Sequence, residues 1–302
     1  MLFSVVIPTF NRLKYLPATL ASVRAQRFTD FETVVVDDGS TDGTRDYLTT
    51  LGADVRVVRQ DNRGPGAARN AGVAAAKGDY IAFLDSDDLW FPWTLDSFAG
   101  VIGASSPSIV TASIIEFSEE GRLTQVSDAP VRHRVFPDFF SSSALPISVG
   151  SGTAVIRRAA FLASGGFTDR SINGEDHDLI LRLGDAAGFA QILEPITFAW
   201  RRHADSATGD LAKSIDGMLY LIAEEQIGRY PGGPTRAQER RQIITRHLRP
   251  ISFAALRAGN MAAAARLYRM AFVWHLRSAR LSYLAAFPFA MAWRVLKGPA
   301  QS

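Results

Sequence analysis

The first hundred residues alternate between short apolar runs rich in β-branched residues and longer segments with helical periodicity. Nearly continuous apolar runs, separated by helices of about 10 to 15 residues, are typical of parallel strands that are covered on both faces. The sequence therefore predicts a β-α-β-α-β-α-β order and an α/β fold, in which ligands bind beyond the carboxyl ends of the strands. The expected strands are 4–8, 31–38, 55–58 and 79–85, and the expected helices are 13–25, 42–51 and 66–76.

The pattern loosens after residue 104. There we expect strands within 107–117, 152–158 and 190–202, a helix over 176–183 and a loop of small polar residues over 141–152. From residue 235 onward only helical periods appear, with expected breaks at Pro250, near Gly259 and at Pro288. The Gly-Pro cluster at 230–235 predicts a boundary between a domain of residues 1–230 and a helical extension of residues 235–302.

The balance of charge changes sign at the same boundary. Residues 231–302 contain twelve Lys or Arg and the single acid Glu239, whereas residues 1–230 contain twenty-one basic and twenty-nine acidic residues. A hydrophobic content of 47% with 21% charged residues is ordinary for a folded chain and excludes disorder and coiled-coil rods. The chain has no cysteine, so disulfides and thiolate chemistry are excluded, and any metal must bind oxygen or imidazole ligands.

Three carboxylates stand within four residues, directly after the expected strand 79–85: Asp85, Asp87 and Asp88. Like charges this close repel one another unless a cation or solvent separates them. The Asp-x-Asp spacing turns alternate side chains of an extended segment to one side, and Mg²⁺ or Mn²⁺ prefers carboxylates together with waters and substrate phosphates. The alternative is an exposed acidic turn in which Asp87 or Asp88 caps a helix.

Two further acidic groups suggest a binding or catalytic role. Asp37 and Asp38 end the strand 31–38, where Asp38 or Ser40 can cap the next helix and leave one carboxylate to accept the imide N–H of a pyrimidine base or a sugar hydroxyl. The segment Glu175–Asp178 opens the expected helix 176–183, and the helix dipole explains part of this acidity. A carboxylate there can also act as a general base toward an alcohol.

Two basic segments complete the set. Arg201, Arg202 and His203 follow an expected strand and form either a solvated edge or a corner that neutralises a diphosphate, with His203 as a donor or a metal ligand. Arg69 lies in RGPGAARNAG, which is neither a phosphate-binding P-loop nor a dinucleotide fingerprint. Small residues there favour close packing of a helix on the sheet, and the alternative is that Arg69 reaches the ligand-binding rim.

The order of these motifs resembles glycosyltransferase family 2, the inverting nucleotide-sugar transferases. The resemblance covers about residues 3–210 and is carried by VVIPTFNR, VVVDDGSTDGT, NRGPGAARNAG, GDYIAFLDSDD, GEDHDLILRL and WRRHADS. It implies a GT-A fold, with a Rossmann-like, mostly parallel sheet and helices on both faces. It also implies transfer from a nucleoside diphosphate sugar, with UDP as the expected carrier and Mg²⁺ or Mn²⁺ as the cofactor.

The resemblance also assigns roles to individual residues. Pro8, Thr9 and Phe10 would flank the nucleobase, which Asp38 would hold. Asp85 and Asp87 fall on the metal-binding aspartate motif, and Asp176 matches the catalytic base. Two basic residues of the donor site complete the assignment, Arg69 in a motif typical of the family and His203 near the diphosphate, where it is also a candidate metal ligand.

Acceptor and pathway are expectations of a broader kind. We expect a glycan or lipid-linked acceptor in cell-surface polysaccharide synthesis. One alternative is a noncatalytic nucleotide-sugar binding or assembly module at a membrane complex. The other, a sugar-1-phosphate nucleotidyltransferase, would require a glycine-rich basic loop where this chain has PTFNR.

The basic extension combines arginines with aromatic residues, which suits an anionic membrane interface. The alternative is that its helices pack on the catalytic domain or on a second copy of the chain. Its least charged run, 281–293, is too short to span a bilayer, and no nucleic-acid-binding module accompanies the charge. Because MLFSVVIPTF lacks the features of a cleaved signal peptide, we expect a cytoplasmic protein, peripheral on the inner face of the plasma membrane if the extension binds lipid.

Overall fold

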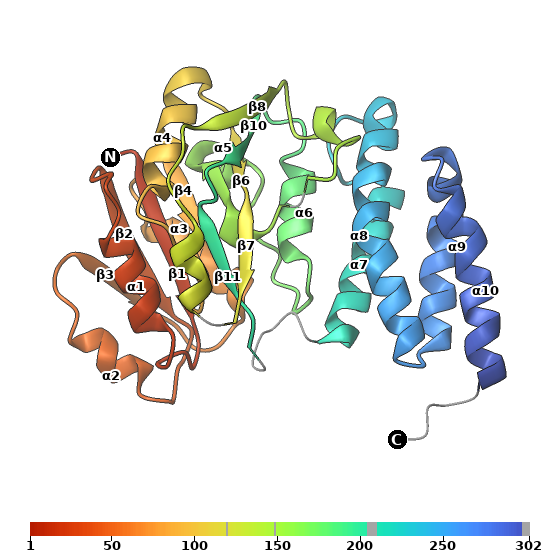
Figure 1. The fold of residues 1–302 in the computed structure, drawn as a ribbon, viewed down its shortest axis with the longest axis horizontal. Helices are drawn as coiled ribbons and strands as arrows, with labels where there is room; N and C mark the ends of the chain where they lie inside the picture. The colour runs from red at the N-terminus through yellow and green to blue at the C-terminus, as the bar shows by residue number, and fades with distance from the viewer. Residues whose placement is uncertain (119, 148, 204–209, 298–302) are drawn as a thin grey trace. The chain divides into compact units, whose positions relative to one another are not determined.

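The computed structural model describes residues 1–118, 120–147, 149–203 and 210–297 (Figure 1). It contains two compact units. The first unit comprises Met1–Phe139, Ser148–Asp169 and Ala186–Ala204, and the second comprises Phe140–Ile147, Arg170–Asp185 and Asp205–Ser302. These units differ from the expected division at 230–235, because two helices that precede the boundary are grouped with the C-terminal helices. A functional division into residues 1–230 and 235–302 stays a prediction.

The first unit is built on an eight-stranded sheet with the order β3-β2-β1-β4-β9-β6-β10-β8. Pairing is parallel from β3 to β4 and between β6 and β10, and antiparallel at β9 and β8. This confirms the expected α/β fold with a mostly parallel sheet. The strands are β1 (Phe3–Thr9), β2 (Phe31–Asp37), β3 (Val55–Arg59), β4 (Tyr80–Phe83), β6 (Ile109–Ala112), β8 (Arg132–Phe136), β9 (Ala154–Arg157) and β10 (Phe189–Glu194).

Helices cover both faces of this sheet, as expected. Val5 and Ile7 of β1 share a core with the apolar residues of α1 and α4, while Val6, on the opposite face, lies under α3. A Cβ atom at Gly72 of α3 would come within 2.4 Å of Val6 Cγ1, so the expected close packing at this glycine is confirmed. The helices of the first unit are α1 (Leu16–Arg24), α2 (Thr44–Thr49), α3 (Pro65–Ala75), α4 (Thr94–Ser105) and α5 (Arg158–Ala163).

Two segments that we expected to hold single strands each divide between two sheets. Residues 107–117 form β6 and β7 (Ile114–Phe117), and residues 190–202 form β10 and β11 (Phe198–Arg201). Pro195 has no N–H for a continued ladder, and the Ser113 hydroxyl donates to the carbonyls of Ile192 and Leu193 where the chain leaves the main sheet. The departing strands form a small sheet with the order β5 (Leu89–Trp90), β11, β7.

The second unit is helical. It contains α6 (Glu175–Arg182), α7 (Leu211–Gln226), α8 (Ala237–Arg257), α9 (Met261–Arg277) and α10 (Leu281–Lys297). The expected break near Gly259 is confirmed, but those at Pro250 and Pro288 are wrong, because both prolines lie inside helices. Both are exposed, and buried neighbours such as Leu248 and Phe287 hold each helix on its partners, which outweighs the lost backbone hydrogen bond.

Four short 3₁₀ segments complete the described elements, at Glu120–Gln125, Phe140–Ser142, Ser151–Thr153 and Pro234–Arg236. In the part of the chain that the structure describes, no helix is both long and apolar enough to cross a membrane.

Part of the basic extension is bound internally in the second unit. The buried carboxylate of Glu225 on α7 accepts from Arg240 Nε at 2.6 Å and from Arg241 Nε at 3.0 Å. These two arginines of α8 thus find their counter-charge on a neighbouring helix. This part of the extension follows the packing alternative.

Candidate functional site

The sheet topology places the site at one edge. Thr9 at the end of β1 pairs with Asp37 at the end of β2, and the Leu84 N–H after β4 donates to the Val6 carbonyl at 3.1 Å. The segments that follow these three parallel strands therefore meet at the same rim. After β4 the chain passes through Asp85–Asp88 into β5, whose antiparallel pairing with β11 brings the end of β11 to the same place.

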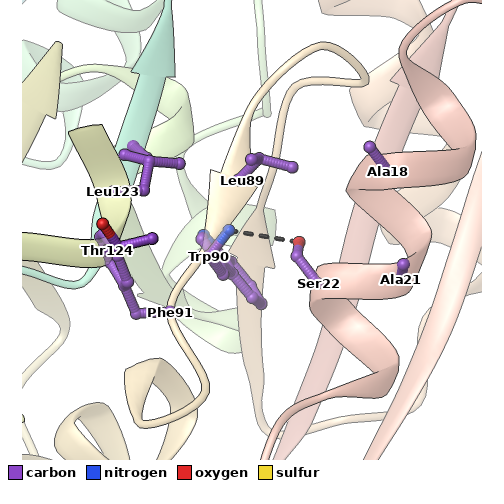
Figure 2. Close-up of a pocket in the computed structure, with 9 residues that line it drawn as sticks. Ala18, Ala21, Ser22, Leu89, Trp90, Phe91, Leu123 and Thr124 are labelled. Atoms are coloured by element: carbon purple, nitrogen blue, oxygen red, sulfur yellow. Dashed lines mark hydrogen bonds between the residues drawn. The ribbon is translucent and has the colours of Figure 1, made fainter. Parts of the chain in front are cut away.

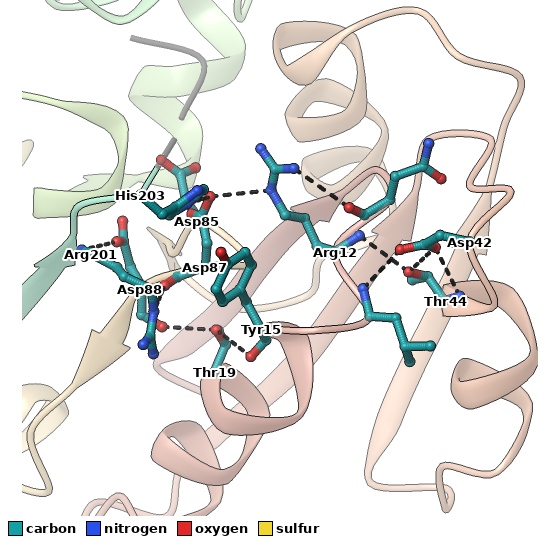
Figure 3. A network of polar contacts seen from close by, with 12 residues as sticks. Arg12, Tyr15, Thr19, Asp42, Thr44, Asp85, Asp87, Asp88, Arg201 and His203 are labelled. Carbon is teal, nitrogen blue, oxygen red and sulfur yellow. Dashed lines mark hydrogen bonds and ion pairs between the residues drawn. The ribbon is translucent and has the colours of Figure 1, made fainter. Parts of the chain in front are cut away.

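Asp87 is the centre of a polar network at this rim. Its Oδ2 atom accepts from Arg12 Nε at 3.2 Å and lies 3.0 Å from His203 Nε2, and its backbone carbonyl accepts from Arg201 Nε at 2.8 Å. In Figure 3 the side chains of Asp87 and His203 lie together and Arg12 extends toward them. The His203 ring also stacks on Tyr15, with the ring centroids 4.6 Å apart. Sequence reasoning missed Arg12, although it lies in the PTFNR segment that was singled out.

Asp85 has a separate cationic partner. Arg69 Nη2 donates to Asp85 Oδ1 at 2.7 Å, and the Arg69 guanidinium lies over the Phe167 ring, 5.3 Å from its centroid. Arg69 is 4% exposed, so its side chain runs through the core from α3 to the rim. Arg69 therefore reaches the rim, while Gly72 on the same helix allows close packing on the sheet.

Asp88 has a structural role. It is buried, and its Oδ1 atom accepts the Arg201 N–H at 2.8 Å, which joins the end of β11 to this turn. Burial and the charges of Asp85 and Asp87 raise the pKa of Asp88 to about 9. The alternative that Asp87 or Asp88 caps a helix is wrong, because the chain enters β5 directly and α4 begins only at Thr94.

Asp38 holds the neighbouring loop. Its carboxylate is buried and accepts from Gln60 Nε2 at 2.6 Å and from the N–H groups of Arg63 and Gly64, each at 2.9 Å. The expected cap by Asp38 or Ser40 is wrong, because Gly43 is the N-cap of α2 and has no side chain to offer. A carboxylate has about four acceptor positions, so a further contact between Asp38 and a base stays a prediction.

The Pro8–Phe10 segment ends β1 at the same rim. Thr9 is buried, and its carbonyl accepts the Asp38 N–H at 2.9 Å, which joins the two candidate nucleobase segments. The Phe10 ring is 42% exposed and can offer a face for stacking. The roles of Pro8, Thr9 and Phe10 in donor binding stay predictions.

Asp176 lies in the second unit, in the first turn of α6. Its Oδ1 atom accepts from the His177 N–H at 2.7 Å and lies 2.8 Å from His177 Nδ1, while His177 Nε2 lies 3.0 Å from His247 Nδ1 on α8. Burial lowers the pKa of His177, but the carboxylates of Asp176 and Glu175 outweigh this effect and raise it. Because Asp87 and Asp176 belong to different units, their convergence on one pocket stays a prediction.

Another acidic residue of α6, Asp178, has a structural role. The fully buried Asp178 accepts from Arg182 Nη2 at 2.8 Å and from the Tyr230 hydroxyl at 3.1 Å, so it stabilises the interior of the second unit.

Sequence reasoning also missed His247. No local pattern indicated it, because its partner His177 is seventy residues away in the sequence.

The donor atoms of the DSDD segment fit a hard divalent cation. Among the described residues no group of three or more His, Asp or Glu gathers as a complete metal site. However, Asp85 Oδ2 and Asp87 Oδ1 each lack a hydrogen-bond partner in the described part of the chain. Two such oxygens suit Mg²⁺ or Mn²⁺, which completes its coordination with waters and substrate phosphates. A ligand role for His203 stays a prediction, since its Nε2 atom lies against Asp87.

A cavity of about 450 Å³ lies elsewhere on the first unit (Figure 2). Its lining is mostly apolar and comes from α1, β5, β11 and the Glu120–Gln125 segment, and it includes Ala18, Leu89 and Phe91. None of the expected site residues lines it. The polar rim rather than this cavity therefore contains the candidate chemistry.

Comparisons with known proteins show what the first part of the chain is similar to. The family model described as Glycosyl transferase family 2 matches residues 4–162. An uncharacterized glycosyltransferase of Nostoc sp. is 44% identical over 109 residues, which are 35% of this chain and 34% of the relative. The poly(ribitol-phosphate) beta-N-acetylglucosaminyltransferase TarS of Staphylococcus aureus is 41% identical over 108 residues, which are 34% of this chain and 19% of TarS. The matches thus span about a third or less of these relatives.

Solved structures share the fold over nearly the whole chain. Residues 1–349 of S. aureus TarS in complex with UDP-GlcNAc align with a TM-score of 0.69 at 18% identity, covering 100% of this chain and 93% of that one. A mannosyltransferase of Pyrobaculum calidifontis in complex with GDP-Man and Mn²⁺ aligns with a TM-score of 0.53 at 20% identity, covering 96% and 87%. These likenesses confirm the expected GT-A fold.

Proposed function

Because the chain belongs to glycosyltransferase family 2, we propose that it transfers a sugar, with inversion, from a nucleoside diphosphate donor to an acceptor hydroxyl. We take UDP as the carrier, Mg²⁺ or Mn²⁺ as the cofactor, and a glycan or lipid-linked molecule in cell-surface polysaccharide synthesis as the acceptor. The observation that best supports this proposal is the rim, where Asp85 and Asp87 pair with Arg12, Arg69 and His203. The UDP-GlcNAc bound to one fold relative supports UDP as the carrier, and the GDP-Man and Mn²⁺ bound to the other support a nucleotide-sugar donor with a divalent cation.

On the donor side, the rim residues would bind and orient the diphosphate. Asp85 and Asp87 would hold the divalent cation, which when bound stabilises the negative charge of the leaving diphosphate. Arg12 and His203 fix the Asp87 carboxylate through one oxygen, and Arg69 fixes Asp85 in the same way. This arrangement keeps the second oxygen of each carboxylate in a defined orientation. Phe10 would stack on the base, next to the loop that Asp38 holds.

On the acceptor side, Asp176 would remove the proton from the attacking hydroxyl. The hydroxyl oxygen then forms the new bond to the anomeric carbon while the bond to the diphosphate breaks, and the proton passes to the Asp176 carboxylate. His177 orients this carboxylate through its Nδ1 atom, 2.8 Å away. A single displacement needs the base and the leaving group on opposite faces of the sugar, which gives inversion.

The test is a screen of donor hydrolysis across nucleotide sugars with and without Mn²⁺. The proposal predicts turnover of one donor, stimulated by Mn²⁺ and lost in Asp87→Asn, while the exposed Asp46→Asn on α2 behaves as wild type. Donor binding without turnover would favour the noncatalytic alternative. Full activity of Asp87→Asn would contradict the proposed role of the rim.

We also propose that the C-terminal helices bind an anionic lipid surface. Large apolar residues are exposed on α9 and α10, and exposed arginines lie on α9 and at the end of α8. The apolar residues are Phe272, Val273, Leu276, Leu281, Phe289, Trp293, Val295 and Leu296, and the arginines are Arg257, Arg266, Arg269 and Arg277. Each engaged arginine would contribute roughly 1 kcal/mol near acidic lipid.

Vesicles of phosphatidylglycerol and phosphatidylcholine test this assignment by co-sedimentation. The double variant Phe289→Ser/Trp293→Ser changes only exposed side chains, so we expect an intact fold and loss of sedimentation. Unchanged sedimentation of the variant would refute lipid binding through this face. A wild-type dimer in solution that the variant abolishes would assign the face to a second copy instead.

A further inference from the structure

A group of basic side chains in the second unit has no acidic partner. Arg246 and Arg249 lie on α8, His275 lies on α9, and Arg280 lies just before α10. Within the described residues, no carboxylate forms an ion pair with any of these four. The neighbouring Arg240 and Arg241 on the same helix share the buried Glu225. The unit therefore supplies one shared carboxylate to Arg240 and Arg241 and none to the next group of basic side chains.

The helix geometry brings these side chains together. Gln242, Arg246 and Arg249 are spaced i, i+4, i+7 on α8 and share one face. Arg280 Nη2 donates to the Gln242 carbonyl at 2.8 Å, so Arg280 lies across this face. One turn beyond Arg249, the Ser252 hydroxyl lies 2.8 Å from the Tyr283 hydroxyl. Arg249 thus faces the junction of α9 and α10, between two fixed contacts.

His275 closes the group from α9. Its ring packs on Tyr283 with the centroids 4.4 Å apart, and it is fully buried. Neither ring nitrogen of His275 has a hydrogen-bond partner among the residues that the structure describes, and the same holds for the buried Arg249 Nε and Arg280 Nη1 atoms. Four buried polar atoms without partners are costly, and an anion would satisfy the three that donate: Arg249 Nε, Arg280 Nη1 and the protonated nitrogen of the His275 ring.

The electrostatics agree with this geometry. Burial and the neighbouring arginines, Arg249 and Arg246, lower the pKa of Arg280 to about 10. Burial, Arg280 and Arg249 lower the pKa of His275 to about 3. The positive charges thus repel one another here, and a bound anion would replace this repulsion with attraction.

The group is connected to the proposed catalytic base within the same unit. Arg246 donates to the carbonyls of Ser143 and Ile147, and so holds the first part of the expected loop over 141–152. The next residue, His247, contacts His177, which in turn contacts Asp176. An anion bound beside Arg246 would therefore belong to the acceptor side of the site.

We propose that Arg249, Arg280 and His275 form a binding site for a phosphate group carried by the acceptor. This inference rests on the proposed function and extends it to the class of acceptor, a phosphate ester or a pyrophosphate. Arginine forks match phosphate oxygens in geometry and charge, and His275 can donate one hydrogen bond from the ring nitrogen that carries its proton. The phosphate can belong to a lipid carrier or to a soluble phosphorylated glycan, and both present the same oxygens.

The experiment is a calorimetric titration of the full chain with inorganic pyrophosphate in chloride buffer without divalent cations. We expect binding by the wild type, about tenfold weaker binding by Arg249→Gln, partial recovery in Arg249→Lys, and no change in Lys213→Gln, an exposed lysine on α7 of the same unit. Equal affinity of the wild type and Arg249→Gln would overturn the proposal. Circular dichroism of each variant confirms that it folds, and His275→Gln provides a second variant at a different position.

Two additional measurements separate the sources and the hypotheses. Farnesyl pyrophosphate that binds more tightly than pyrophosphate indicates a lipid carrier, whereas equal affinities indicate recognition of the phosphate alone. Mn²⁺-dependent UDP binding by Arg249→Gln tests the donor site independently. If UDP binds and the donor is hydrolysed but pyrophosphate binding does not depend on Arg249, the phosphate site is refuted and the proposed function stands. If pyrophosphate binding depends on Arg249 but no nucleotide sugar is turned over, the proposed function fails.

Discussion

The buried His275 predicts a specific loss of stability in acid. Its pKa of about 3 in the folded chain lies below the value of about 6.5 for an unfolded histidine. The folded state therefore disfavours the protonated ring, and stability is fully present above pH 6.5 and falls as the pH drops toward 3. The groups that face the ring are Arg249 on α8, Arg280 before α10, and Tyr283 on α10.

The size of this effect follows from the pKa difference. At pH 5, about 1.5 units below the unfolded value, the loss is about 2 kcal/mol, because each unit corresponds to about 1.4 kcal/mol. Urea unfolding at pH 7.5 and pH 5 in phosphate-free buffer, followed by circular dichroism, measures the free energy of unfolding. His275→Leu should lose about 2 kcal/mol less than the wild type between these values. The exposed His133→Gln should match the wild type, and an equal loss in His275→Leu would refute the reasoning.

Two further predictions concern the second unit. Glu225→Gln leaves Arg240 and Arg241 without their shared counter-charge in the interior, so we expect a loss of about 3 to 5 kcal/mol in unfolding free energy, against little change for the exposed Asp216→Asn. A loss below about 1 kcal/mol would show that the pair is not buried as described. His177→Phe removes the hydrogen bond to Asp176, worth about 1.5 to 3 kcal/mol for a charged acceptor, so kcat should fall about 10- to 100-fold with little change in donor KM. A raised donor KM with unchanged kcat would contradict its role beside the base.

The local patterns predicted the rim because strand ends and motif order are properties of short segments. Apolar runs located β1, β2 and β4, and parallel pairing then required Thr9, Asp37 and the DSDD segment to share an edge. The division of two expected strands between sheets was not predictable from hydrophobicity, which is the same on both sides of Ser113 and Pro195. Topology decides which sheet each half joins.

The expected caps and breaks were wrong where tertiary packing outweighed local preference. Asp is a common residue at helix caps, but the Asp38 carboxylate binds a loop more than twenty residues away in the sequence. Pro250 and Pro288 interrupt backbone hydrogen bonds, yet buried apolar contacts keep α8 and α10 continuous. The contact between His177 and His247 joins distant segments, so no local pattern could indicate it.

The measurement that tests the account most directly compares Asp87→Asn with Asp176→Asn in two assays, Mn²⁺-dependent binding of UDP and hydrolysis of the donor sugar, in which water replaces the acceptor. The account predicts that Asp87→Asn loses the stimulation of UDP binding by Mn²⁺. It predicts that Asp176→Asn binds UDP as the wild type does and loses hydrolysis. Wild-type hydrolysis by Asp176→Asn, or undiminished Mn²⁺ stimulation in Asp87→Asn, would contradict the division of roles between the two carboxylates.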